Sequence, residues 1–179
     1  MCSSDLGKTM QLAARGAKVT AVEVDPARAA RIRENLARTR LSADIIESDV
    51  RDVAMTAPLV LLDAPCSATG TIRRHPDLPW IKGAADVTVS AAAAYEILES
   101  AAAMVEPGGT LVFAVCSLER EEGEEQAARV GLAPDPIRPE ELPAGLPPTP
   151  EGWLRTDPGM LAEAGGLDGF FIARWRKQA

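Results

Sequence analysis

The stretch LDAPCSATGTIRRHPDLPWIK occupies residues 62–82 and directly follows the apolar run Leu59-Val60-Leu61. A short apolar run that ends in turn-forming residues is typical of a buried strand that opens into a loop. Parallel sheets carry their chemistry at the carboxyl ends of their strands, which is where Asp63 and Cys66 stand. A cysteine after a strand is more often a small buried hydrophobe than a reactive group. Here the neighbouring carboxylate, the hydroxyl side chains and the single histidine of the chain favour a reactive loop.

Strands and helices alternate along the rest of the chain. Apolar and β-branched runs predict strands over residues 18–23, 44–47, 58–62, 110–115 and 169–177. Helical spacing of apolar residues predicts helices over residues 9–15, 26–39, 88–105 and 119–132. Asp25 is placed as an N-cap before a proline, and Pro107-Gly108-Gly109 is placed to end a helix. The alternation predicts an α/β fold with a mostly parallel sheet and an antiparallel last strand.

The segment between residues 133 and 150 is rich in proline. Proline removes a backbone donor and disfavours regular structure, so we expect an extended loop here, with at most a short strand near residues 133–137.

Composition limits the class of protein. With 179 residues and 46% hydrophobic content, the chain is long enough for one domain with a sizeable core. No run has the length of a membrane span and no signal peptide is recognisable, so we expect a soluble, cytoplasmic protein. Its three cysteines, Cys2, Cys66 and Cys116, are odd in number and widely spaced, which indicates free thiols rather than disulfides. They lack metal-ligand spacing, so we expect no metal site.

The net charge of −7 argues against nucleic-acid binding, because phosphate contacts need clustered cations. Locally the picture differs, since basic residues gather in two groups: Arg73, Arg74, His75 and Lys82, and then Arg174, Arg176 and Lys177. The first group is equally consistent with direct RNA contact and with a solvated turn made rigid by prolines. Trp80 lies beside it and is either a rim residue or a surface on which a base could stack.

A second cysteine, Cys116, follows the predicted strand 110–115. Both cysteines and Asp63 are therefore expected at one edge of the sheet, which suggests pyrimidine chemistry. Carbon 5 of a pyrimidine is a poor nucleophile until a thiolate adds to carbon 6. A carboxyl group hydrogen-bonded to ring nitrogen 3 would stabilise the negative charge that this addition creates.

Two acidic residues end the earlier strands. Glu23 could accept hydrogen bonds from the hydroxyl groups of a ribose, although a solvated strand end explains it equally well. Asp49 could accept from an adenine amino group, although a turn-forming aspartate is the commoner explanation.

The loops at residues 63–70 (DAPCSATG) and 72–77 (IRRHPD) resemble the signature loop of the RsmB/Sun-type ribosomal-RNA cytosine-5 methyltransferases. The segment 116–119 (CSLE), with EEGE at 121–124, is similar to that family's second cysteine motif, and residues 168–174 (DGFFIAR) are similar to its last strand. The resemblance implies a Rossmann-like fold that uses S-adenosylmethionine to form 5-methylcytosine in RNA, with small-subunit ribosomal RNA as the expected substrate. We expect the protein to be a monomer.

The resemblance also implies roles for single residues. Cys116 is the implied nucleophile, and Cys66 assists removal of the proton or release of the product. Asp63 is the residue implied to hold the base. The residues implied to line the cofactor pocket are Gly7, Lys8, Glu23, Asp49 and Asp63. The residues implied to bind the substrate are Pro65, Arg73, Arg74 and His75.

The beginning of the chain departs from the family pattern. The family's cofactor loop reads roughly D-x-C-A-A-P-G-G-K-T after a first strand, whereas here only Cys2, Gly7, Lys8 and Thr9 fall in register. We therefore expect residues 1–179 to be a truncated catalytic domain that lacks the first strand and the upstream RNA-binding region, and that binds its cofactor poorly. The rival hypotheses are a methyltransferase that acts on DNA or on a small molecule, and a non-catalytic fragment that only binds RNA.

Overall fold

The computed structural model describes residues 5–179, and the chain divides into two compact units, Met1–Ala54 and Met55–Ala179. Cys2, predicted to be a free thiol in register with the family's cofactor loop, lies outside the described residues. Each unit is described by itself below, and the single catalytic domain expected over residues 1–179 stays a prediction.

The first unit contains two helices and a small parallel sheet. In chain order its elements are α1 Asp5–Ala14, β1 Thr20–Val22, α2 Pro26–Thr39, β2 Asp44–Ile46 and the 3₁₀ turn η1 Val50–Asp52. Strands β1 and β2 pair in parallel, with Thr20 opposite Asp44. The first helix begins earlier than predicted, so Gly7 and Lys8 lie within a helix rather than in a loop before it.

Helix α2 begins where the sequence predicts. The Asp25 side chain accepts a hydrogen bond from Ala27 N at 2.8 Å, and so satisfies a backbone donor that has no partner within the helix. The apolar positions Ala29, Ile32 and Leu36 recur at helical spacing and are buried. The predicted strand–helix unit is therefore confirmed.

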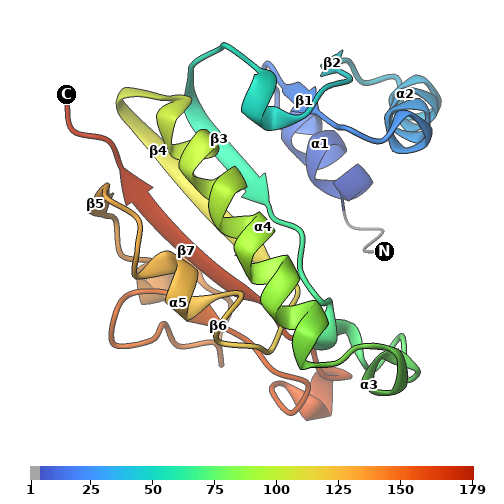
Figure 1. Ribbon diagram of the computed structural model, residues 1–179, viewed down its shortest axis with the longest axis vertical. Helices are drawn as coiled ribbons and strands as arrows, with labels where there is room; N and C mark the ends of the chain where they lie inside the picture. Colours follow the sequence, from blue (N-terminus) through green and yellow to red (C-terminus); the bar gives the residue numbers. More distant parts are fainter. Residues whose placement is uncertain (1–4) are drawn as a thin grey trace. The chain divides into compact units, whose positions relative to one another are not determined.

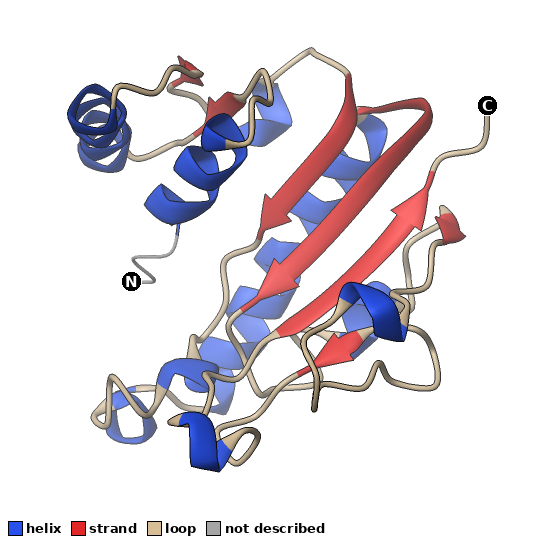
Figure 2. Ribbon diagram, turned by 180° about the vertical axis from the view of Figure 1, so that it is seen from behind, coloured by secondary structure: helices blue, strands red, loops and turns tan. Residues whose placement is uncertain are grey.

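The second unit is built on three long strands: β3 Ala57–Asp63, β4 Val105–Val115 and β7 Phe171–Arg176. Strand β4 pairs in parallel with β3 and antiparallel with β7, as predicted for the last strand. Two short strands, β5 Ala133–Pro134 and β6 Leu154–Arg155, also pair antiparallel with β7. Figure 1 shows helix α4 Ala84–Ala103 running along β3 and β4 on one face, and Figure 2 shows the strands from the opposite side.

The core of this unit lies between α4 and the strands. Leu98 on α4, Phe113 on β4 and Phe171 on β7 have no exposed surface. The two phenylalanine rings meet edge to face, with centroids 6.2 Å apart. Burying three side chains of this size stabilises the fold by several kcal/mol, at roughly 1.5–3 kcal/mol each.

The remaining elements are short: η2 Thr69–Thr71, α3 Leu78–Ile81, α5 Glu124–Ala127, η3 Pro139–Glu141 and η4 Ala162–Ala164. The helix predicted over residues 119–132 is therefore wrong, because only its middle is helical. The cause is tertiary packing: a Cβ at Gly123 would lie 2.9 Å from a ring carbon of Phe171, so the backbone of this segment is pressed against β7.

Pro107-Gly108-Gly109 was also predicted wrongly as the end of the long helix. Helix α4 ends at Ala103, and the three residues lie within β4. Glycine suits position 109 of this strand, because a Cβ there would lie 2.8 Å from Pro58 O on β3. The pairing of β3 with β4 shifts register between Ala57 and Leu59, beside this glycine.

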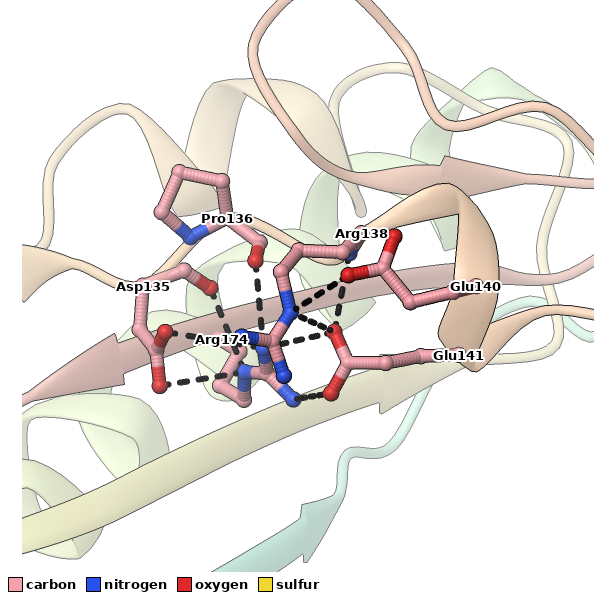
Figure 3. A network of polar contacts seen from close by, with 6 residues as sticks. All are labelled: Asp135, Pro136, Arg138, Glu140, Glu141 and Arg174. Atoms are coloured by element: carbon pink, nitrogen blue, oxygen red, sulfur yellow. Dashed lines mark hydrogen bonds and ion pairs between the residues drawn. The ribbon is translucent and has the colours of Figure 1, made fainter.

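An ion-pair network joins the proline-rich segment to β7 (Figure 3). Arg174 Nη1 lies 2.9 Å from Glu141 Oε1, and Arg174 Nε lies 3.2 Å from Asp135 Oδ2. Arg174 also donates to the Pro136 carbonyl oxygen at 3.1 Å. One basic side chain of the last strand therefore contacts a loop that has little regular structure of its own.

This network predicts an acid-sensitive contribution to stability. The Arg174 guanidinium, together with the Arg138 backbone N–H, lowers the pKa of Glu141 from 4.5 to about 2. A carboxyl whose pKa is lower in the folded state stabilises the protein above its unfolded pKa, and that stabilisation disappears as the pH falls. We expect Glu141→Gln to lower the urea midpoint at pH 7, and the difference from the unchanged protein to vanish as the pH falls from about 4.5 toward 2.

Glu140→Gln is the matched control for this measurement. Glu140 is 69% exposed and its Oε1 lies 3.3 Å from Arg138 Nε, so its removal should change the urea midpoint little at any pH. Equal effects of the two substitutions at pH 7 would contradict the assigned role of Arg174.

Candidate active site

The two predicted thiols meet at one edge of the sheet. Strands β3 and β4 run side by side to their carboxyl ends, where Asp63 lies opposite Ala114 in register. The loops that follow bring Cys66 Sγ to 3.5 Å from Cys116 Sγ, and the two cysteines are not joined by a disulfide bond. Cys66 is half-buried and Cys116 is 3% exposed. The predicted convergence of the two strand ends is confirmed.

Hydrogen bonds donated by backbone N–H groups join the two cysteine loops. Gly70 N donates to the Cys116 carbonyl oxygen at 3.1 Å, and Leu118 N donates to Thr69 Oγ1 at 3.0 Å. Gly70 leaves no room for a side chain, because a Cβ there would lie 1.9 Å from Gly169 O. The last loop before β7 is therefore packed against the first cysteine loop.

A fully buried carboxylate lies between the loops. Glu122 has no exposed surface, yet its Oε1 accepts from Ser67 N at 2.7 Å and its Oε2 accepts from Ser67 Oγ at 2.6 Å. Ser67 follows Cys66 directly, and its hydroxyl oxygen is 3.5 Å from Ser117 Oγ, which follows Cys116. A buried carboxyl group is tolerated when its oxygens find donors, and Ser67 supplies one to each oxygen here.

The environment favours ionisation of one thiol. The hydrogen bond from the Cys116 thiol lowers the pKa of Cys66, and the backbone N–H groups of Ala68 and Cys116 act in the same direction. Burial and the negative charge of Glu122 oppose them and raise the pKa. The net direction is downward, which increases the fraction of thiolate, the reactive form of a cysteine.

Arg155, on β6, supports the second cysteine loop. Its guanidinium pairs with Glu124 and donates to the carbonyl oxygen of Ser117. It also lies 5.1 Å from the centre of the Phe171 ring. Sequence reasoning did not single out Ser67, Glu122 or Arg155. The acidic run at residues 121–124 was the signal for Glu122, while nothing near Arg155 in the sequence pointed to this site.

The predicted substrate residues lie in or just after the first cysteine loop, and they differ in their exposure and in their contacts. Pro65 and His75 are exposed. Arg73 Nη2 donates to Gly165 O at 2.6 Å, and Arg74 forms an ion pair with Asp168 at 2.6 Å. Both arginines therefore hold the loop before β7 against the first cysteine loop. Trp80, at 89% exposed, is among the most accessible large apolar side chains of the second unit.

The predicted cofactor residues divide between the units. Gly7, Lys8, Glu23 and Asp49 belong to the first unit, and the half-buried Asp63 belongs to the second. Glu23 and Asp49 follow the parallel strands β1 and β2, so they lie beyond the same edge of that small sheet.

Both of these carboxylates make local contacts. Glu23 Oε1 accepts from Asp25 N at 2.9 Å. Arg51, hydrogen-bonded to Asp49, lowers the pKa of that carboxyl to about 2, so it is ionised at neutral pH.

Two further surveys concern only residues 5–179. No helix in that range combines the length and apolarity that crossing a bilayer needs. Within the same range, no group of three or more histidine, cysteine, aspartate or glutamate side chains is placed to bind a metal ion.

Comparisons with known proteins identify the family. Residues 1–176 match the family described as 16S rRNA methyltransferase RsmB/F. Ribosomal RNA small subunit methyltransferase B of Erwinia tasmaniensis is 38% identical over 187 residues, which cover 99% of this chain and 41% of that protein. The protein of the same name from Vibrio vulnificus is 37% identical over 191 residues, with the same coverage. The chain thus spans about two fifths of the length of these curated relatives.

A solved structure gives the same result at the level of the fold. The crystal structure of NSun6 from Pyrococcus horikoshii with SFG is 25% identical, has a TM-score of 0.80, and covers 97% of this chain and 45% of its own. The predicted Rossmann-like α/β fold is confirmed. By the match over residues 1–176 and by its curated relatives, this chain belongs to the RsmB/F family of 16S rRNA methyltransferases.

Proposed function

We propose that this chain is the catalytic part of an enzyme that methylates carbon 5 of cytosine in RNA, with small-subunit ribosomal RNA as substrate. The observation that carries the proposal is the pair of thiols, Cys66 and Cys116, whose sulfur atoms lie 3.5 Å apart in the loops that follow adjacent strands. Family membership supports the RNA substrate, and we infer a monomer that acts in the cytoplasm.

The proposed reaction begins with Cys116. Its thiolate forms a bond to carbon 6 of the cytosine, and the electrons of the 5,6 double bond make carbon 5 nucleophilic. Asp63 would stabilise the negative charge that develops on ring nitrogen 3 by donating a hydrogen bond to it from the O–H of its carboxyl group. After carbon 5 has gained its methyl group, Cys66 accepts the proton that leaves carbon 5. The double bond then re-forms, and the bond between carbon 6 and the Cys116 sulfur breaks.

The methyl donor in this proposal is S-adenosylmethionine, which supplies an electrophilic methyl group when it is bound. Glu23 and Asp49 fit such a ligand, because both acidic side chains follow parallel strands at one edge of the first unit. Glu23 would accept hydrogen bonds from the ribose hydroxyls, and Asp49 would accept from the adenine amino group. Gly7 and Lys8, which belong to the same unit, complete the proposed set. A relative solved with SFG supports this choice of cofactor class.

The proposed RNA surface is the first cysteine loop and the turn after it. Pro65 and His75 are exposed there and are free to meet a nucleotide. Arg73 and Arg74 contribute differently, because their guanidinium groups are already bonded to the loop before β7. Their main proposed role is therefore to keep the shape of the surface, with their positive charge as a secondary attraction for phosphate.

Transfer of labelled methyl groups tests the proposal. The chain is incubated with S-adenosylmethionine carrying a tritiated methyl group and with either small-subunit ribosomal RNA or DNA of equal sequence. We expect label in RNA as 5-methylcytosine and none in DNA. Label in DNA alone would replace the RNA substrate with a DNA substrate. RNA binding without any transfer would leave a non-catalytic RNA-binding fragment as the better description.

A further inference from the structure

The two sulfur atoms of the candidate site lie in contact with each other, and the proposed reaction needs both of them. We propose that the two-cysteine site is also a reversible redox switch: a hydroperoxide oxidises the Cys66 sulfur, Cys116 then closes a disulfide bond with it, and a thiol reductant reopens that bond. The chemistry stands independently of the proposed function, on which only the expected loss of activity rests. Disulfides in reducing compartments are usually transient and either catalytic or redox-sensing, which fits this use.

The positions of the two sulfurs suit a disulfide. Cys66 Sγ lies 3.5 Å from Cys116 Sγ, whereas a disulfide bond is roughly 2.05 Å long, so the atoms must approach by about 1.5 Å. Because each sulfur moves by rotation about its Cα–Cβ bond, this shift can be divided between two side chains. The backbones are already held together, since Gly70 N donates to the Cys116 carbonyl oxygen at 3.1 Å and the strands before the two loops pair in parallel. A disulfide would therefore join loops that the fold has already brought together.

The two cysteines differ in a way that sets the order of events. Cys66 is half-buried, so a small oxidant can reach it, whereas Cys116 is 3% exposed. The hydrogen bond from the Cys116 thiol lowers the pKa of Cys66, as do two backbone N–H groups; burial and the charge of Glu122 oppose this, but the net direction is downward. Redox-sensing cysteines combine thiolate character with access and with a second thiol beside them. Cys66 is therefore the sulfur that meets the oxidant, and Cys116 is the sulfur that forms the disulfide with it.

The oxidation takes place in two balanced steps. In the first, the Cys66 sulfur attacks the terminal oxygen of the hydroperoxide, the O–O bond breaks, and the thiol proton leaves with the released alcohol or water. Cys66 is then a sulfenic acid. In the second step the Cys116 sulfur attacks the Cys66 sulfur, the S–O bond breaks, and the Cys116 proton leaves with the hydroxide as water. The two thiols together lose two electrons, and the hydroperoxide gains them.

A disulfide at this position would stop the proposed reaction at its first step. A sulfur that is bonded to another sulfur cannot add to carbon 6 of cytosine, and it cannot accept the proton that leaves carbon 5. The same bond protects Cys66, because a sulfenic acid that stays unresolved is oxidised further to a sulfinic acid, which thiol reductants do not reverse. Cys116 thus keeps the oxidation of its neighbour reversible.

Mass spectrometry of the intact chain and of its peptides tests the switch without RNA or cofactor. In every protein used, Cys2 is replaced by serine, so that Cys66 and Cys116 are the only cysteines. After treatment with hydrogen peroxide we expect a disulfide between these two residues, which dithiothreitol reverses. Cys116→Ser should instead hold Cys66 as a sulfenic acid that dimedone labels. Cys66→Ser should lose its remaining thiol at least about tenfold more slowly, because Cys116 is buried.

Three results would overturn the proposal. The first is that the chain with both thiols forms no disulfide under peroxide. The second is that the disulfide joins two separate chains, which non-reducing gels reveal. The third is that dimedone labels Cys116 in the Cys66→Ser variant but does not label Cys66 in the Cys116→Ser variant, which would contradict the order of the two steps.

A second experiment links the disulfide to the proposed reaction. RNA with 5-fluorocytosine has no proton to lose at carbon 5, so a methylated covalent adduct persists and can be counted. With S-adenosylmethionine present, we expect peroxide treatment to lower the amount of adduct at least about tenfold and dithiothreitol to restore it. Full adduct formation by the disulfide form would overturn the switch. If the chain forms no adduct before treatment, the proposed function fails, while the mass measurement still decides the redox chemistry.

Discussion

Gly70→Ala is expected to lower the free energy of unfolding by about 3 kcal/mol, because backbone atoms of other loops already occupy the space that the new methyl group needs. A Cβ at this position would lie 1.9 Å from Gly169 O, 2.7 Å from Gly169 C and 3.0 Å from Cys116 O. All three are backbone atoms, which cannot rotate away as a side chain can. The loops must therefore separate, and the hydrogen bonds from Gly70 N to Cys116 O and from Gly169 N to Gly70 O lengthen or break.

Gly131→Ala is the control for this substitution. A Cβ at Gly131 would meet no atom within 4 Å, and the residue is exposed, so the change in unfolding free energy should stay within about 0.5 kcal/mol. Urea unfolding followed by tryptophan fluorescence measures both variants. If the two midpoints agree, the first cysteine loop and the loop before β7 do not pack as described.

The sequence predicts well those elements whose boundaries are set by residues close to them in the chain. The start of α2 follows from Asp25 and Pro26, which act within one turn of the chain. The ends of β3 and β4 follow from apolar runs that stop at a carboxylate or a cysteine. The same reasoning fails where contacts with distant segments determine the secondary structure. Gly123 lies against Phe171 and Gly109 lies against Pro58, and both regions were predicted wrongly.

The residues of the candidate site also differ in whether the sequence predicts their positions. The meeting of Cys66 with Cys116 could be predicted, because each follows a strand and parallel neighbours end at one edge. The position of Glu122 could not, since it lies 55 residues beyond Ser67 in the chain and reaches it only in the folded state. Arg155 is a further 33 positions along and comes from a strand of two residues that no periodicity reveals. Motif residues are visible in sequence, whereas the groups that orient them are visible only in three dimensions.

Cys116→Ala should reduce the covalent adduct with 5-fluorocytosine RNA by at least about a hundredfold, to background. Without the sulfur no bond to carbon 6 can form, and alanine offers no other nucleophile. Cys66→Ala should still form the adduct, because its proposed role comes after the bond to carbon 6 exists. The amount of adduct is read from denaturing gels of the chain with labelled RNA and S-adenosylmethionine.

The two variants control for each other, since both remove one partner of the same 3.5 Å contact and one side chain of equal size. A loss that merely reflected the broken contact would be equal in both. Cys66 is the more exposed of the two residues, whereas Cys116 is only 3% exposed, so the reverse result has a physical basis as well. Adduct lost in Cys66→Ala and kept in Cys116→Ala would exchange the two roles.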